Sequence, residues 1–361
     1  MAPTTDMEEL RNLSLYPATP EQIYEYRSRM FPSWGRGHTR EQYDARDNAL
    51  DDLEHAADGK MVSWVLAPRD HPKSLDFKCA CETYRRKGRY YDGEMKTVTC
   101  YGIASVFTPD RNRRKGYAKH MMHLLHWVLA DEQFLKDFPG VGSPPPREFY
   151  KACGDTLTTG GWVTQDAMST IWEVEVTASK VSAPASGWEW LSEKEVGEVW
   201  KEDVPLLEKE IMERAKEVGK PVAAFMPDHG VGAFQHMRLV LSEPHGPLIT
   251  KSWGVKATEG SLAYATWSVD VHGLTPTVRK TLLLTRLRVQ SQEQFKELMG
   301  MVVGLAKEGG FQKVEFWNLP ANLEAEAQTM GGVTSERTAH FPSIKCYASD
   351  DVVWVFNEKW A

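Results

Sequence analysis

Cysteine is scarce in this 361-residue sequence, and the five cysteines do not form a recognisable pattern. They are Cys79, Cys81, Cys100, Cys153 and Cys346. A disulfide-stabilised secreted domain carries more cysteines in a shorter chain, and a structural zinc site needs about four ligands at a regular spacing. The sequence therefore predicts reduced thiols and no metal site.

Long apolar runs and an excess of basic charge are also absent. No run approaches the roughly 20 residues of a membrane span, and residues 1–20 lack the basic and then apolar segments of a secretory signal. The formal net charge is -7 at pH 7, so the chain as a whole has no electrostatic attraction to nucleic acid or to an anionic membrane. We expect a cytoplasmic protein with no nucleic-acid partner and no membrane partner.

The hydrophobic pattern predicts an α/β chain in two units. Alternating or continuous apolar runs predict strands, and apolar residues three to four apart predict helices. Thr19 and Gln22 have the spacing of a capping box at the start of a helix. The strands expected in the first unit are 13–19, 61–68, 75–86, 97–108 and 169–177, and its helices are 20–31, 40–59, 117–135 and 148–154.

A second unit follows the small, polar segment 178–187, whose composition is typical of a connection between domains. Its expected strands are 262–271, 281–289, 313–319 and 350–357, and its expected helices are 291–310 and 322–330. We therefore predict one domain at residues 1–180 and another at residues 188–361.

The turn RNRRKGYAKHMM, residues 111–122, combines several basic side chains with one glycine between an expected strand and an expected helix. A solvated charge cluster is one interpretation. The alternative is a phosphate site, because the first N–H groups of a helix have no partner within the helix and attract anions. Gly116 and Ala118 leave the backbone accessible to an anion. The strand before the turn and the amphipathic helix after it favour the phosphate site.

Residues 106–125, VFTPDRNRRKGYAKHMMHLL, resemble the R-x-x-G-x-A acetyl-CoA signature of the GCN5-related N-acetyltransferases (GNAT), and EFYKACG, residues 148–154, resembles that domain's F-Y-x-x-x-G segment. The overall layout is similar to the fungal lysine N6-acetyltransferases. The resemblance implies a mixed α/β (α+β) fold: an N-terminal GNAT fold, with a twisted, mostly antiparallel sheet flanked by helices, and a C-terminal GNAT-like α/β half. It also implies acetyl-CoA as co-substrate.

The resemblance further implies a role for each matching residue. Tyr150 is implied as the catalytic residue that protonates the departing thiolate or hydrogen-bonds to it. Backbone groups of Val106 and Thr108 are implied to hold the pantetheine arm, and the amides of residues 113–118 to hold the pyrophosphate. The full implied set of acetyl-CoA-binding residues is Val106, Thr108, Arg113, Arg114, Lys115, Gly116, Tyr117, Ala118 and Lys119.

One position departs from the family pattern. Some members carry a glutamate base on the fourth strand, and Gly102 stands at that position here. Another carboxylate is then the base, or water carries the proton away. In the second unit the corresponding stretch QSQEQ, residues 290–294, has no glycine and no basic cluster, so we expect no CoA site there. That unit either completes the acceptor pocket or only stabilises the first unit.

We therefore expect an N-acetyltransferase that acetylates the side-chain amine of free L-lysine by direct attack in a ternary complex. One alternative is a different amine acceptor: a polyamine, an aminoglycoside or a protein N-terminus. A second alternative is a non-catalytic CoA-binding regulatory protein, which Gly102 keeps open because the commonest base position is empty. The sequence gives no indication of the oligomeric state.

Overall fold

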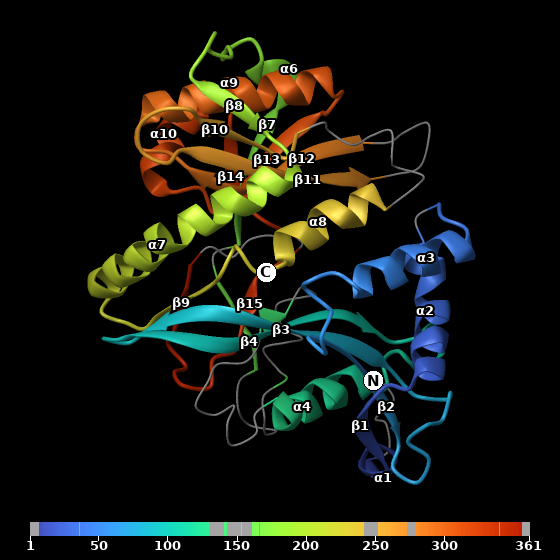
Figure 1. Cartoon of the computed structure of the whole chain (residues 1–361). Coiled ribbons are helices and arrows are strands. Elements are labelled where there is room, and N and C mark those ends of the chain that lie inside the picture. The colour runs from blue at the N-terminus through green and yellow to red at the C-terminus, as the bar shows by residue number, and fades with distance from the viewer. Residues whose placement is uncertain are drawn as a thin grey trace.

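Two β-sheets form the framework of the protein, one in each half (Figure 1). The structure is a computed structural model that describes residues 7–35, 37–129, 141–142, 153, 161–165, 167–241, 252–272, 279–338 and 340–355. Figure 1 shows the halves stacked one above the other, with the long helix α7 (Glu193–Val218) crossing between them.

The first sheet contains the basic turn at one of its strand ends. In order, its strands are β1 (Leu13–Pro17), β2 (Met61–Pro68), β3 (Ala80–Tyr91), β4 (Met95–Phe107), β5 (Val141–Gly142), β15 (Ser343–Ile344) and β6 (Val163–Thr164), with β9 (Val222–Phe225) and β16 (Val353–Trp354) joined beside β3. Strands β1 to β4 pair antiparallel, whereas β4 and β5 pair parallel.

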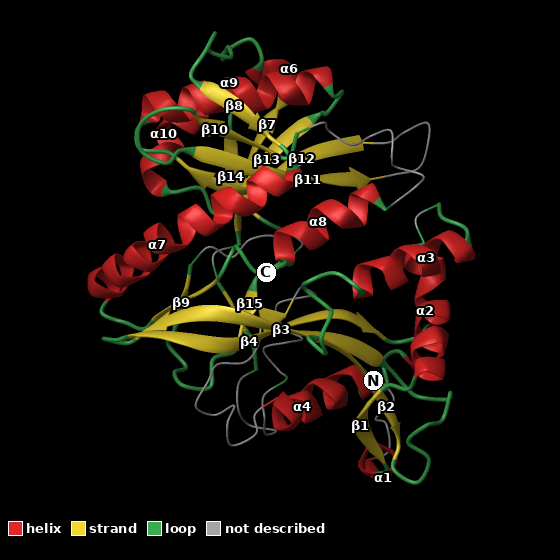
Figure 2. Ribbon diagram, viewed as in Figure 1, coloured by secondary structure: helices red, strands yellow, loops and turns green. Residues whose placement is uncertain are grey.

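Helices cover both faces of this sheet (Figure 2). They are α1 (Met7–Arg11), α2 (Pro20–Trp34), α3 (Arg40–Asp51) and α4 (Tyr117–Leu129). On one face, α4 packs Met121 and Leu125 against Cys81, and on the other, α2 packs Met30 against Val65. The alternation of side chains along a strand produces these two separate cores.

Helix α2 begins where the capping-box spacing predicts. The Thr19 hydroxyl accepts from the Gln22 amide at 3.3 Å, and the Gln22 side-chain oxygen accepts from the Thr19 amide at 3.0 Å. The helix expected at 40–59 ends earlier, at Asp51. Residues 52–60 form turns, and the positive φ angles of Asp58 and Gly59 are incompatible with a continuing helix.

The second sheet repeats the helix-covered arrangement. Its strand order is β14 (Val333–Glu336), β7 (Met168–Glu173), β13 (Lys313–Trp317), β12 (Arg279–Arg288), β11 (Tyr264–His272), β10 (Gly254–Ala257) and β8 (Trp188–Leu191). Its helices are α6 (Val174–Thr177), α7, α8 (Val231–Val240), α9 (Gln292–Glu308) and α10 (Ala321–Thr329). The fully buried rings of Trp172, Trp267 and Phe295 belong to one core between sheet and helices.

Two strands lie in a different sheet from the one the sequence pattern predicted. The strand expected to close the first unit is β7, which pairs with β13 and β14 in the second sheet, and residues 174–177 turn into α6. The strand expected to end the second unit is β16, which pairs with β9 in the first sheet. Periodicity shows which face of a strand is buried but not which strand it joins.

The expected mixed α/β class is confirmed. Each sheet takes strands from both sides of the segment 178–187, so the two halves are tied together by exchanged strands. The division at residues 180 and 188 stays a prediction. Within the described part of the chain, no helix combines the length and the apolar character needed to cross a membrane.

Candidate functional site

The basic turn lies between the end of β4 and the start of α4. After a short 3-10 turn at Asp110–Asn112, Arg114 and Gly116 adopt positive φ angles of 62° and 78°. A Cβ atom built on Gly116 would meet no heavy atom within 4 Å, so the turn is open to solvent. Since α4 begins directly after Gly116, its first N–H groups lie at this opening and form the type of site that binds anions.

The predicted basic residues are all exposed, and Arg113 has contacts within the turn. Arg114, Lys115 and Lys119 are exposed around the turn. Arg113 is also exposed, but its Nε donates to the Thr108 carbonyl at 3.0 Å and its guanidinium pairs with Asp110 at 2.7 Å. Arg113 therefore stabilises the turn by linking it to Thr108 and Asp110.

The Tyr117 side chain is turned away from the solvent around the turn. Its side chain is only 2% exposed and belongs to the core beneath α4, and its hydroxyl donates to the Glu9 carboxylate. Ala118 and Val106 are half-buried. The roles of these residues in acetyl-CoA binding stay predictions.

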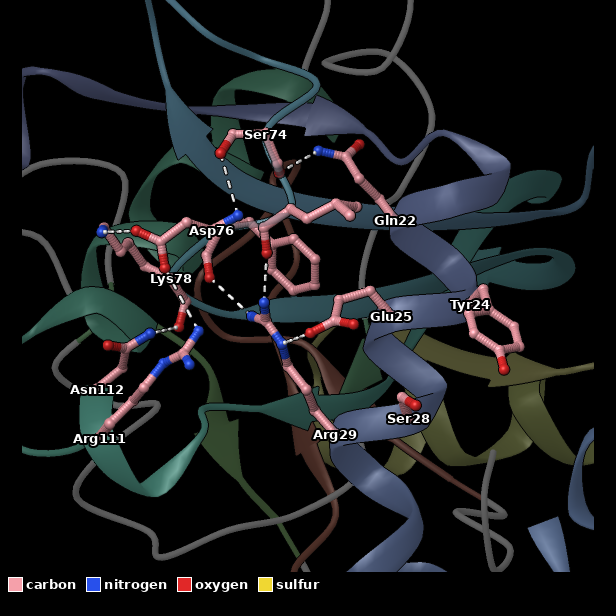
Figure 3. A network of polar contacts seen from close by, with 12 residues as sticks. Gln22, Tyr24, Glu25, Ser28, Arg29, Ser74, Asp76, Lys78, Arg111 and Asn112 are labelled. Atoms are coloured by element: carbon pink, nitrogen blue, oxygen red, sulfur yellow. Dashed lines mark hydrogen bonds and ion pairs between the residues drawn. The ribbon is translucent and has the colours of Figure 1, made fainter.

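A polar network anchors the turn to the loop before β3 (Figure 3). The buried Asn112 donates its side-chain amide to the Lys78 carbonyl at 2.9 Å. Asp76 pairs with Lys78 at 3.1 Å and with Arg111 at 3.4 Å. These contacts fix the position at which α4 starts relative to β3.

Helix α2 holds the same loop from its other side, as Figure 3 also shows. Gln22 donates to the Ser74 carbonyl at 2.9 Å, and Arg29 donates to the Phe77 carbonyl at 2.9 Å. The Arg29 guanidinium also lies 4.1 Å above the centre of the Phe77 ring. The basic turn and helix α2 are thus both anchored to the loop that precedes β3.

Strand β4 contains a bulge just before the turn. Phe107 pairs with Ala80 and Ala104 pairs with Glu82, so Ser105 and Val106 together lie opposite one residue of β3. Ser105 has a positive φ of 54°, and its carbonyl accepts a hydrogen bond from the Tyr26 hydroxyl. A bulge re-aims backbone groups out of the ladder, and here it does so near the end of β4, from which the basic turn follows.

Strand β3 places a buried carboxylate beside this bulge. Glu82 is 8% exposed and accepts a hydrogen bond from the Tyr84 hydroxyl at 2.9 Å. Burial raises the pKa of Glu82, and hydrogen bonds from the Ser105 side chain and Tyr84 only partly offset that rise. A carboxylate of this kind can accept a proton nearer neutral pH than an exposed one.

Sequence reasoning did not identify Glu82. Its one signal is a charged residue inside the strand-like run CACETY, at a position that strand alternation assigns to the opposite face from Cys81. The bulge in β4, which brings Ser105 next to Glu82, has no comparable signal in the sequence.

Arg86 occupies the space that a side chain at Gly102 would need. A Cβ atom built on Gly102 would lie 3.0 Å from both Cζ and Nη2 of Arg86. The guanidinium also lies 5.6 Å from the centre of the Phe225 ring. Burial lowers the pKa of Arg86 to about 10, so the group remains charged at neutral pH.

The second half covers this side of the first sheet. His55, just after α3, stacks on Tyr84 with ring centres 5.7 Å apart and contacts Phe234 of α8 at 4.6 Å. Burial lowers the pKa of His55 to about 4, so it is neutral at pH 7. A Cβ built on Gly230, before α8, would lie 1.8 Å from a Glu54 carboxylate oxygen, which shows how closely the halves approach.

Helix α9 of the second half corresponds to α4, and side chains at its start cap its backbone N–H groups. Ser291 accepts from the Gln294 amide at 3.1 Å, and the Gln294 side chain accepts from the Gln290 amide at 2.8 Å. At the end of β12, Arg286 and Arg288 both pair with the buried Asp203 of α7. These contacts use the amides of Gln290 and Gln294 and the charges of both arginines.

The remaining sequence predictions concern the cysteine thiols, metal ligands and Tyr150. Burial raises the pKa of the Cys100 and Cys153 thiols to about 12, so both are protonated at neutral pH and unsuited to nucleophilic attack. Among the described residues, no group of three or more His, Cys, Asp or Glu side chains could hold a metal ion. Tyr150 lies outside the described residues.

Comparison with known proteins assigns the chain to a family. Residues 172–361, just over half of the chain, match the family described as the LYC1 GNAT-like C-terminal domain. A lysine acetyltransferase of Yarrowia lipolytica is 30% identical over 173 residues, which span 45% of this chain and 43% of that protein. The matched region is thus less than half of the relative's length.

Two solved structures share the fold across 93% of this chain. A probable N-acyltransferase from Enterococcus faecalis has a TM-score of 0.56 and 12% identity, with 73% of that chain covered. A GCN5-related N-acetyltransferase from Anabaena variabilis has a TM-score of 0.55 and 11% identity, also with 73% covered. The expected GNAT fold is confirmed, and the chain belongs to the LYC1 GNAT-like family of the GCN5-related N-acetyltransferases.

Proposed function

We propose that this protein transfers the acetyl group of acetyl-CoA to the side-chain amine of free L-lysine, which yields N6-acetyllysine and CoA. The observation that carries the proposal is the open, basic start of α4, which follows β4 and its bulge in the chain, together with the buried Glu82, which pairs with Ala104 of that strand. An anion site and a proton acceptor are the two elements that this reaction requires. The Yarrowia lipolytica relative, named a lysine acetyltransferase, supports lysine as the acceptor.

Acetyl-CoA binds with its pyrophosphate at the start of α4. The amides of residues 113–118 donate to the phosphate oxygens, and the exposed side chains of Arg114, Lys115 and Lys119 add positive charge. The open space above Gly116 fits a bulky anion, because no side chain competes for it. Backbone groups of Val106 and Thr108 hold the pantetheine arm that leads from the turn to the bulge.

Proton removal comes before attack, since an ordinary lysine amine has a pKa near 10.4 and is protonated at neutral pH. Glu82 accepts the proton from the lysine ammonium. The neutral nitrogen then attacks the thioester carbon, a C–N bond forms and the C–S bond breaks. The second amine proton reaches the departing sulfur through Tyr150, and Glu82 releases its proton to solvent, so the reaction is balanced without another reactant.

The bulge in β4 also stabilises the charge that develops in the transition state. A backbone N–H of β4 near Ser105 hydrogen-bonds to the thioester oxygen as negative charge develops on it. Binding the two reactants together in one site removes several kcal/mol of the barrier. The second half closes the acceptor side through α8, and it binds no CoA itself.

The test is release of CoA thiol from acetyl-CoA in the presence of L-lysine, ornithine, spermidine, an aminoglycoside or a lysine-containing peptide, with mass spectrometry of the products. We expect turnover with L-lysine and an added mass of one acetyl group on its side-chain nitrogen. Preferred turnover of another amine would contradict lysine as the acceptor. Tight acetyl-CoA binding without turnover of any amine would instead support the non-catalytic alternative.

A further inference from the structure

Three aromatic rings connect helix α8 of the second half to the Glu82 carboxylate. The centre of the Phe234 ring in α8 lies 4.6 Å from that of His55, His55 stacks on Tyr84, and the Tyr84 hydroxyl donates to Glu82. We propose that Phe234 and Tyr84 are positioning residues, through which the second half holds the Glu82 carboxylate for proton transfer from the acceptor amine. This inference rests on the proposed function, because it concerns the base of that reaction.

The hydrogen bond between Tyr84 and Glu82 is the contact through which the aromatic rings act on the carboxylate. The two residues are two positions apart along β3, so their side chains lie on the same face of the sheet. The Tyr84 hydroxyl donates to a Glu82 oxygen at 2.9 Å. Burial and the nearby carboxylate raise the pKa of Tyr84 above 10, so the hydroxyl remains a donor at neutral pH. Such a donor favours the ionised form of Glu82.

His55 holds the Tyr84 ring in place. The two ring planes are 20° from parallel, and their centres are 5.7 Å apart. His55 belongs to the turn 52–60, which is attached to β3 because the Arg85 amide donates to the Lys60 carbonyl at 2.8 Å. Burial lowers the pKa of His55 to about 4. Its charge is therefore constant at neutral pH, and it acts on Tyr84 by ring contact alone.

Helix α8 carries Phe234 and is anchored to the second sheet. Figure 1 shows α8 beside α3, and the Nε2 atom of His236 in α8 donates to the Trp267 carbonyl at 3.0 Å. Gly230, directly before α8, has a φ of 72°, and a Cβ atom there would lie 2.9 Å from the backbone nitrogen of His55. The start of α8 thus contacts the turn that carries His55, which fixes Phe234 relative to the aromatic stack.

Charged and titratable groups of the first half also lie near Glu82. They are Tyr26 and Arg27 of α2, Tyr43 and Asp51 of α3, and Arg86 further along the same face of β3. Arg27 favours the ionised carboxylate and Asp51 disfavours it, and the two pair with each other at 2.5 Å. Burial raises the pKa of Tyr26 and Tyr43 above 10, so both are uncharged at neutral pH. Tyr84 is the neighbour of Glu82 that the aromatic stack connects to α8.

The experiment measures kcat/KM for L-lysine from about pH 6 to about pH 9 in the wild type, Tyr84→Phe, Phe234→Leu and the double variant. Tyr84→Phe keeps the ring and deletes the donor, so the rise of kcat/KM with pH should move upward by about 1 pH unit. Phe234→Leu weakens the stack and should move it upward by about half a unit. Phe316→Leu, the same substitution in β13 of the second sheet, is the control and should leave the midpoint unchanged.

The double variant tests whether Phe234 acts through Tyr84. Without the hydroxyl the stack has no donor to position, so the double variant should show the shift of Tyr84→Phe alone. A shift equal to the sum of the two single shifts would overturn the inference. An unchanged midpoint in Tyr84→Phe would also overturn it, as would a loss of kcat/KM by one factor at every pH, which a purely structural role predicts. Should Phe234→Leu not fold, Phe234→Met is compared in its place.

The proposed function and this inference fail in different ways. If Glu82→Gln keeps the wild-type pH profile, Glu82 is not the base, and the inference is wrong although lysine acetylation stands. If the wild type acetylates no amine, the proposed function fails by itself. Titration of the Glu82 carboxyl carbon by NMR, with Glu82→Gln to identify its signal, then decides the inference. A midpoint that rises in Tyr84→Phe and in Phe234→Leu supports it, and an unchanged midpoint in either variant overturns it.

Discussion

The Arg86 guanidinium occupies the space that a side chain at position 102 would need: a Cβ atom at Gly102 would lie 3.0 Å from the Arg86 Cζ. Gly102 has no positive φ angle that would require glycine, so the reason for glycine is space. The position at which some relatives carry a glutamate base is therefore filled from the neighbouring strand by a guanidinium. The Arg86 guanidinium occupies that space, and the buried carboxylate of β3, Glu82, lies two residues before Tyr84, the residue that pairs with Gly102.

The first prediction follows from this pair. Gly102→Glu should not restore a base, because the new carboxylate would lie against Arg86 and form an ion pair with it. We expect kcat/KM for L-lysine to fall at least about tenfold, and the melting temperature to fall because neighbouring atoms must move. The control is Gly304→Ala in α9, where a Cβ meets no atom within 4 Å. A Gly102→Glu variant with higher activity than the wild type would refute the argument.

The second prediction concerns the phosphate turn. Gly116 has a φ of 78° and Gly59 a φ of 70°, and both have open space where a Cβ would stand. Alanine at either position should cost about 1 kcal/mol of unfolding free energy, because an L-residue is strained there. Only Gly116→Ala should also weaken acetyl-CoA binding, by about tenfold, because its methyl group stands at the start of α4. Calorimetric titration of both variants with acetyl-CoA measures the difference, and equal affinities would argue against the turn as the binding site.

Much of this site can be predicted from the sequence, and the reason is local. The basic turn, the start of α4 and the empty base position at Gly102 are set by residues that are neighbours in the chain, so pattern and spacing reveal them. Glu82 is different, because its role depends on a bulge in another strand and on the Tyr84 hydroxyl. No pattern within β3 indicates that Ser105 of β4 will face it.

The same distinction explains the errors in strand assignment. Their apolar residues predict both β7 and β16 as strands, but β7 pairs in the second sheet and β16 pairs in the first. Pairing of strands that are distant in the chain is decided by packing of the two halves, and a hydrophobic pattern alone does not encode it. The exchange also ties the second half to the first sheet, and α8 lies over the face of β3 that carries Tyr84, as the contacts of His55 with Tyr84 and Phe234 show.

The third prediction concerns Tyr150, which is known from the sequence resemblance alone. Tyr150→Phe should slow turnover about 100-fold, because the departing thiolate then lacks its proton donor, while acetyl-CoA affinity should change little. Single-turnover kinetics with L-lysine and a parallel binding titration separate the two effects. A variant that keeps the wild-type rate and pH profile would show that another group or water protonates the sulfur.

The fourth prediction is the pH dependence that Glu82 imposes on activity. Only the ionised carboxylate accepts a proton, so kcat/KM for L-lysine should rise with pH through the raised pKa of Glu82. In Glu82→Gln that rise should disappear and kcat should fall about 100-fold or more. Glu94→Gln serves as the control, because Glu94 is an exposed carboxylate in the turn after β3, at the end of the strand away from Glu82. An unchanged pH profile in Glu82→Gln would remove Glu82 from the mechanism.

The contribution of Glu82 to stability should fall with rising pH, whereas its contribution to activity should rise. Because its folded-state pKa is raised above the ordinary value of 4.5, folding favours the protonated form. Its contribution to stability is therefore fully present below pH 4.5 and is lost as the pH rises through the folded-state pKa. Glutamine stays neutral, so Glu82→Gln should melt above the wild type at pH 8, and the difference should shrink toward pH 4. If Glu82 had only a structural role, Glu82→Gln would melt below the wild type at every pH. If Glu82 is a buried base that lowers stability, Glu82→Gln should be more stable than the wild type at pH 8 and less active.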